Sequence, residues 1–144
     1  MTASDSGRGD QPTMDELRRA GGDLTAKGSA IDDLPDMWDG FMRMVRSGLG
    51  LSAFGVNIMN LPPDYTTRSH DESGSGQEEL YVRLAGAGWL VLDDSGERLT
   101  LDEEHLAAVG PGTARSLSSG PEGLRVLCVG STPGAPYDPV DYGG

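Results

Sequence analysis

Gln77-Glu-Glu-Leu-Tyr-Val-Arg-Leu-Ala-Gly-Ala-Gly88 is the stretch that decides the fold, and a second apolar segment, Trp89-Leu-Val-Leu92, follows it directly. The cluster Asp93-Asp-Ser-Gly96 comes next, and then Glu97-Arg-Leu-Thr-Leu101. Two apolar runs joined by a short cluster of Asp, Ser and Gly predict a β-hairpin. The two glycines that close the first stretch are expected to supply the positive φ of a turn before the hairpin.

The deciding stretch has two different faces, because successive side chains of a strand point to opposite sides. One face carries Glu79, Tyr81 and Arg83, and the other carries Leu80, Val82 and Leu84. Both faces cannot be the core, so the alternation leaves open which of them lines the interior, and a bulge would change it. Glu78 and Glu79 point to opposite faces, so this acidic pair is not predicted to be a catalytic carboxylate dyad.

Other short apolar runs separated by turns extend the β pattern along the chain. Strands are predicted at residues 55–61, at residues 116–117 before a turn at residues 118–123, and at residues 124–129, where β-prone residues are densest. Residues 41–51 fit a helix stripe or strands, and residues 64–76 are predicted to be a mobile loop. Some eight short strands without helices between them predict an antiparallel sandwich or barrel.

Composition and charge restrict the possible partners. A net charge of −12 argues against binding the nucleic-acid backbone, which needs clustered Lys and Arg. No apolar run approaches the ~18 residues of a membrane-spanning helix, so no membrane role is expected. The single Cys128 cannot form an intramolecular disulfide, and no secretory signal pattern opens the chain. We therefore expect a cytoplasmic protein in which Cys128 fills the core.

Two regions are predicted from the distribution of polar and apolar residues. Residues 1–36 read as an N-terminal extension that is disordered over residues 1–12 and has a short helix beginning near Thr13, where the spacing to Glu16 matches a capping box. Residues 37–144 read as one folded β domain that ends in an irregular tail rich in proline.

Two motifs resemble the cupin family. Glu79, six intervening residues and Gly86 resemble the second half of the first cupin motif, and Val109-Gly-Pro-Gly-Thr-Ala-Arg115 resembles the Pro-x-Gly-x-x-His core of the second. The resemblance covers about residues 41–139, and it favours strands over a helix in residues 41–51. It implies an all-β fold, a single cupin jelly-roll β-barrel following the short helical or disordered extension, and it implies a homodimer.

The usual metal ligands of cupins are largely missing from this chain. Cupins typically hold one metal ion with three histidines and a glutamate, and here only His70 and Glu79 match those positions. Arg115 replaces the histidine of the second motif, and arginine has no lone pair to offer. We therefore expect no metal and no other cofactor. The alternative is a set of His70, Glu72 and Glu79 holding a hard or borderline ion, whereas His105 is expected at the surface.

The resemblance and these departures together predict a cupin that binds a small-molecule ligand without the usual metal. His70 and Glu79 are the candidate catalytic residues, acting as a general base in a non-redox isomerisation or cyclisation. Tyr81, Arg115 and Met59 are the candidate ligand-binding residues, and Glu79 is expected to contact Arg115 directly or through one water. Two alternatives stay open, namely a metal-dependent dioxygenase-type cupin and a ligand-binding or accessory cupin without turnover.

Overall fold

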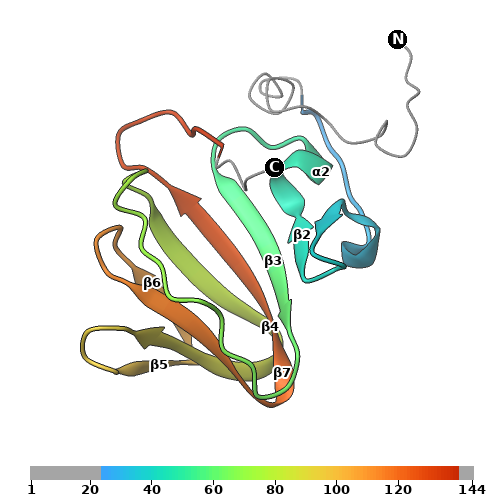
Figure 1. Ribbon diagram of the computed structural model, residues 1–144. Coiled ribbons are helices and arrows are strands. Elements are labelled where there is room, and N and C mark those ends of the chain that lie inside the picture. Colours follow the sequence, from blue (N-terminus) through green and yellow to red (C-terminus); the bar gives the residue numbers. More distant parts are fainter. Residues whose placement is uncertain (1–23, 140–144) are drawn as a thin grey trace.

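The structure is a computed structural model that describes residues 24–139, and antiparallel β-strands make up most of its regular secondary structure (Figure 1). Its strands are β1 (Asp36–Met37), β2 (Met42–Met44), β3 (Gly55–Leu61), β4 (Glu78–Leu92), β5 (Arg98–Leu101), β6 (Leu106–Val109) and β7 (Arg115–Ser131). The helices of the described part are short, a 3-10 turn η2 (Ile31–Asp33) and α2 (Val45–Leu49). None of them is long and apolar enough to cross a membrane. The disordered start and the helix expected near Thr13 lie outside the described residues.

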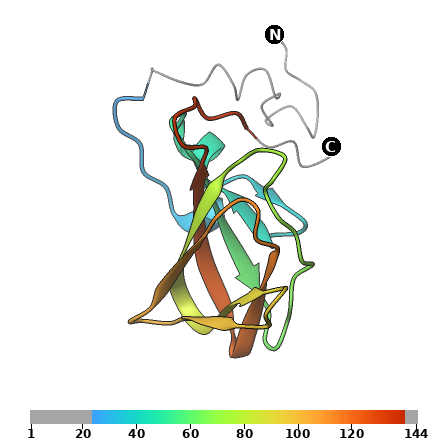
Figure 2. The same ribbon diagram turned by 90° about the vertical axis from the view of Figure 1, so that its left-hand side faces the viewer.

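The two long strands, β4 and β7, organise the sheet. Its strand order is β1-β2-β3-β7-β4-β5, with β6 also paired to β4, and all pairs are antiparallel. The first half of β4 lies between β7 and β6, and its second half lies between β7 and β5. The sheet therefore curls around an interior, as the turned view shows (Figure 2). The predicted hairpin is confirmed as β4–β5, with Gly96 in its turn at φ 75°.

The core lies on both faces of β3, because alternate residues of this strand point to opposite sides. The main cluster fills the barrel and consists of Leu61, Tyr81, Leu90, Leu101, Ala107, Val109, Leu117, Leu124 and Val126. A second cluster of Leu34, Val45, Val56 and Ile58 packs on the outer side of β3. Val45 belongs to α2, so part of the stretch that fitted either a helix or strands forms a helix that covers this outer face.

The sequence did not decide which face of β4 lines the interior. In the structure it is the polar face. Tyr81 is only 1% exposed, whereas Leu80 and Leu84 are 36% and 37% exposed on the outside. The polar face is stable in the interior because its groups bond to one another, as described below. An outer face that carries leucines is thus the consequence of a polar interior, and hydrophobicity alone would have chosen the opposite orientation.

The two glycines of the deciding stretch do not make the expected turn, because both lie inside β4. The register between β4 and β7 shifts twice there, once between Arg83 and Ala85 and once between Gly86 and Gly88. Gly86 has a φ of 68°, and a Cβ on it would collide with the carbonyl oxygen of Gly123. The glycines therefore allow a β-bulge where two backbones approach closely. The turn predicted at residues 118–123 is wrong as well, because β7 continues through these residues beside the bulge.

The segment predicted to be a mobile loop, residues 64–76, is instead held against β7 over part of its length. Isolated bridges join Thr66 to Ser118 and His70 to Arg115. The N–H groups of Thr67 and His70 donate to the carbonyls of Leu117 and Arg115, each at 2.9 Å. The polar composition of the segment concealed this pairing, because it is made by the backbone, which needs no apolar alternation.

Candidate functional site

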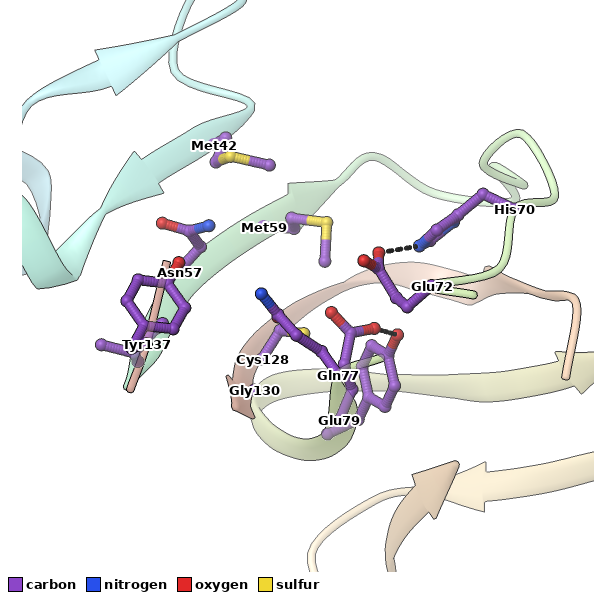
Figure 3. A pocket seen from close by; sticks show the side chains of 13 residues that line it. Met42, Asn57, Met59, His70, Glu72, Gln77, Glu79, Cys128, Gly130 and Tyr137 are labelled. Atoms are coloured by element: carbon purple, nitrogen blue, oxygen red, sulfur yellow. Dashed lines mark hydrogen bonds and ion pairs between the residues drawn. The ribbon is translucent and has the colours of Figure 1, made fainter. Parts of the chain in front are cut away.

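Three side chains spaced two residues apart build the polar wall of the site. Gln77, Glu79 and Tyr81 stand at or just before the start of β4, and strand alternation turns all three inward. They line a cavity of about 130 Å³ (Figure 3). Sequence reasoning found Glu79 and Tyr81 but missed Gln77. The signal that could have found it is the same alternation extended back by two residues.

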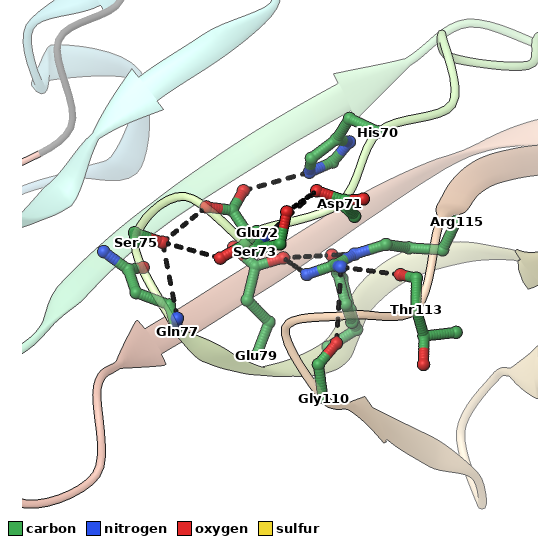
Figure 4. A network of polar contacts seen from close by, with 11 residues as sticks. His70, Asp71, Glu72, Ser73, Ser75, Gln77, Glu79, Gly110, Thr113 and Arg115 are labelled. Carbon is green, nitrogen blue, oxygen red and sulfur yellow. Dashed lines mark hydrogen bonds and ion pairs between the residues drawn. The ribbon is translucent and has the colours of Figure 1, made fainter.

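Arg115, the first residue of β7, has a side chain that is 0% exposed and donates four hydrogen bonds within the protein. Nη2 donates to Glu79 Oε1 at 2.7 Å, and Nε donates to the Tyr81 hydroxyl at 3.4 Å. Nη1 donates to the carbonyls of Thr113 at 2.8 Å and Gly110 at 3.5 Å (Figure 4). Burial lowers the pKa of Arg115, but the bonds to Tyr81 and Glu79 outweigh it and raise the pKa. The predicted contact between Glu79 and Arg115 is confirmed.

Tyr81 and Arg115 share one carboxylate oxygen. The Tyr81 hydroxyl donates to Glu79 Oε1 at 2.5 Å, the same atom that accepts from Arg115. Two donors converge on this one oxygen and fix the orientation of the Glu79 carboxyl group. Its second oxygen, Oε2, accepts no hydrogen bond from a nitrogen or oxygen atom of residues 24–139. This oxygen therefore faces the cavity without an N–H or O–H donor, while the Cys128 thiol is a hydrogen-bonding neighbour of the same carboxylate.

The phenol of Tyr81 and the thiol of Cys128 both keep their protons. Burial, together with the nearby Cys128 and Glu79, raises the pKa of Tyr81 far above its usual range. Burial also raises the pKa of the Cys128 thiol well above its usual value. A protonated buried thiol is a poor nucleophile, so Cys128 contributes to the cavity wall as core filling.

His70 and Glu72 complete the polar end of the cavity from the segment that precedes β4. The His70 N–H donates to the Arg115 carbonyl, and the Arg115 N–H donates back to the His70 carbonyl at 2.8 Å, so β7 fixes the backbone of His70. Its Nε2 lies 3.2 Å from Glu72 Oε2. Glu72 Oε1 accepts a hydrogen bond from the Ser75 hydroxyl at 3.0 Å. The carboxylate of Glu72 thereby orients a half-exposed imidazole (Figure 4).

An apolar space adjoins this polar end. A second cavity, of about 310 Å³, shares Met42, Met59, His70, Glu72 and Tyr81 with the first. Its other lining residues include Phe41 and Leu117, and Trp38 stands at its exposed outer end. The two cavities are parts of one interior that is polar at one end and apolar along its walls.

Whether these residues fit a metal ion depends on their donor atoms. His70, Glu72 and Glu79 each offer one ligand atom, and the three atoms lie within 4.8 Å of one another. A hard or borderline divalent ion could use such a set. The usual three-histidine set is not formed, because Arg115 stands where a histidine would be and bonds to Glu79. One imidazole and two carboxylates stand in place of the usual three histidines and one glutamate, so the donor set does not fit the metal that the resemblance implies.

We accordingly expect protein purified without chelators to contain well under one equivalent of iron, manganese, zinc or nickel by elemental analysis. Arg115→His, which removes the guanidinium and supplies an imidazole, should raise metal uptake. Near-stoichiometric metal in the unaltered protein, lost in Glu72→Gln, would contradict the expectation. That result would assign His70, Glu72 and Glu79 as ligands.

Solved structures have the same arrangement of strands. A cupin protein from Bacteroides fragilis superposes with a TM-score of 0.61 at 20% identity, covering 81% of this chain and 96% of its own. The chain has the cupin fold. An RmlC-like cupin protein from Desulfovibrio desulfuricans superposes on this chain with a TM-score of 0.58 at 15% identity, covering 74% of this chain and 97% of its own. The jelly-roll expectation is therefore confirmed.

A sugar phosphate isomerase of the cupin superfamily from Silicibacter pomeroyi superposes on this chain with a TM-score of 0.51 at 24% identity. The match covers 62% of this chain and 57% of that one. No protein-family model matches the sequence, and comparison with curated proteins gives no match.

The barrel brings all five predicted site residues to one interior. Met59, His70 and Tyr81 line both cavities, Glu79 lines the smaller one, and Arg115 lines the larger one. Arg115 donates its side-chain hydrogen bonds to protein groups, among them the carboxylate of Glu79. It is therefore a residue that positions Glu79. His105 lies away from this interior, as expected. Its Nδ1 bonds to Asp102 Oδ1 at 2.7 Å, which raises the pKa of the exposed His105.

Proposed function

We propose that this cupin binds a small organic molecule in the barrel, at the polar end formed by His70, Glu72, Gln77 and Glu79. The amide of Gln77 carries the proposal. Gln77 is only 4% exposed, and its side chain makes no hydrogen bond with any residue in the described part of the chain. It points into the cavity beside Glu79 (Figure 3). Buried amides are nearly always paired, so an unpaired one facing a cavity serves an occupant.

We further propose that any turnover is non-redox proton transfer, an isomerisation or cyclisation without a metal. His70 is the better base, because histidine is the side chain that most often transfers protons in enzymes and Glu72 holds its orientation. Glu79 Oε2 is the second candidate base, since Oε1 is engaged by Tyr81 and Arg115. Loss of turnover in His70→Asn with ligand binding retained would separate an enzyme from an accessory binding protein.

One observation favours a second candidate, a metal-dependent cupin. The convergence of His70, Glu72 and Glu79 would hold the ion and place it beside the same cavity. The ion would then act as a Lewis acid toward a bound ligand. The elemental analysis described above decides between the two candidates.

A fragment screen by ligand-observed NMR tests the binding proposal. Small fragments should bind the unaltered protein, and Met59→Trp should weaken that binding by at least about tenfold, because an indole would fill space that both cavities share. Leu106→Trp is the matched control, since Leu106 lies 63% exposed on β6, outside the cavities. Fragments that bind both variants equally, or no fragment binding at all, would reject the proposal.

A further inference from the structure

We infer that the occupant of this cavity is an organic cation, a primary ammonium group on a small apolar body. The inference rests on the proposed function and specifies the class of ligand. The positive charge of the site is paired within the protein. The negative charge exceeds it, so a ligand of positive charge is expected.

The guanidinium of Arg115, the buried positive charge of the site, is hydrogen-bonded to other groups of the protein. Arg115 directs its hydrogen bonds to Glu79, Tyr81, Thr113 and Gly110, and its side chain is 0% exposed. Binding an anion through this guanidinium would require breaking those bonds. The other arginine that lines the interior, Arg68, is exposed at the outer end, away from the polar wall. Among residues 24–139, an anionic ligand therefore finds no available arginine or lysine lining the polar end.

Acceptors and negative charge dominate the same end. Glu72 and Glu79 both line the smaller cavity, and one ligand atom from each, together with one from His70, lies within 4.8 Å of the others. The Arg115 guanidinium is paired with Glu79, whereas the second carboxylate, that of Glu72, has the His70 imidazole as its neighbour at 3.2 Å. Two carboxylates brought together in a partly buried site favour a cation between them.

The number of acceptors suits an ammonium group, which has three N–H donors and no acceptor. Among the described residues, Glu79 Oε2 meets no N–H or O–H donor, and Glu72 Oε2 lies beside His70. The Gln77 amide oxygen lies against Gly130, and rotation of the amide by half a turn presents it to the cavity as a third acceptor. Two carboxylate oxygens and one amide oxygen then match three donors. The unpaired buried amide, which carries the proposed function, is thereby given a specific partner.

The apolar residues that line the two cavities indicate the shape of the rest of the ligand. Met42 and Met59 line both cavities, and their side chains lie over the polar end (Figure 3). Phe41 and Leu117 continue the apolar lining in the cavity of about 310 Å³. Thioethers and aromatic rings adapt well to a flat or irregular apolar group. An aryl or alkyl body extending from the ammonium toward Phe41 fits this gradient.

Three probes of the same shape but different charge test the inference. These are benzylamine, benzyl alcohol and benzoate, titrated by calorimetry into the full chain in the presence of EDTA, which removes competing metal ions. Benzylamine should bind at least about tenfold more tightly than benzyl alcohol, since charge-assisted hydrogen bonds are worth that factor or more, and benzoate should bind most weakly.

Matched variants locate the effect. Glu72→Gln should weaken benzylamine binding at least about tenfold and leave benzyl alcohol binding unchanged. Glu103→Gln removes the same charge from an exposed turn and should change neither. If Glu72→Gln does not fold, Gln77→Met provides a second variant with the same expected direction for benzylamine.

The outcomes also separate this inference from the proposed function. Equal or tighter binding of benzyl alcohol or benzoate, still weakened by Met59→Trp, would overturn the cationic ligand and keep the binding site. Benzylamine binding that is unchanged in both Glu72→Gln and Gln77→Met would overturn it too. If none of the three probes binds, the inference is rejected, and the fragment screen then decides whether the proposed function is rejected with it.

Discussion

Replacing Arg115 by alanine should lower the free energy of unfolding by roughly 3–5 kcal/mol, the cost of leaving a buried charge without its partner. The side chains of Arg115 and Glu79 are 0% and 13% exposed, and their closest nitrogen and oxygen atoms are 2.7 Å apart. The substitution also removes donors from Tyr81 and from the carbonyls of Thr113 and Gly110. Chemical denaturation followed by fluorescence or circular dichroism measures the loss.

Two further variants show whether the unpaired charge is the cause. The double change Glu79→Gln with Arg115→Met should recover much of the loss, because it removes both charges together. Asp32→Asn is the matched control, since Arg125 and Asp32 are 2.8 Å apart but Asp32 is 72% exposed, and it should cost less than about 1 kcal/mol. A loss in Arg115→Ala as small as that of the control would contradict a buried ion pair.

Glu79 and Arg115 could be predicted as partners because two motifs far apart in sequence placed both at ligand positions around one point. Gln77 could not be predicted in this way, because it stands outside both motifs and an amide before a strand is usually exposed. The inward face of β4 also stayed open, since alternation separates two faces without saying which is buried. Only the mutual satisfaction of Glu79, Tyr81 and Arg115 makes the polar face the interior one.

Predictions from local composition were wrong at two places where the backbone geometry determines the structure. The segment of residues 64–76 is polar and rich in glycine and serine, yet bridges to Ser118 and Arg115 hold part of it against β7 and so place His70 in the site. Gly86 was read as a turn residue on the strength of its conformational freedom. That freedom is used, at a φ of 68°, inside a strand instead.

The bulge at Gly86 is what lets one strand present two different faces to the same interior. Before the bulge the buried residue is Tyr81, an odd position, and after it the buried residue is Leu90, an even position. The register shifts between β4 and β7 fall between these two residues. Without the shift in alternation, either the polar wall of the site or the core contact of Leu90 would face outward. The bulge therefore couples the site to the main core.

Gly86→Ala should consequently destabilise the protein by about 3 kcal/mol or more, combining backbone strain at positive φ with a collision against the Gly123 carbonyl. Gly96→Ala is its matched control, because Gly96 has a φ of 75° but no atom within 4 Å of an added Cβ, so only strain of about 1–2 kcal/mol applies. Denaturation of both variants measures the difference.

Because relaxation of the bulge would turn Glu79 and Tyr81 away from Met59, Gly86→Ala should also weaken fragment binding, which Gly96→Ala should leave unchanged. Equal destabilisation by the two alanines would show that the close approach of Gly86 to Gly123 does not hold the bulge in place.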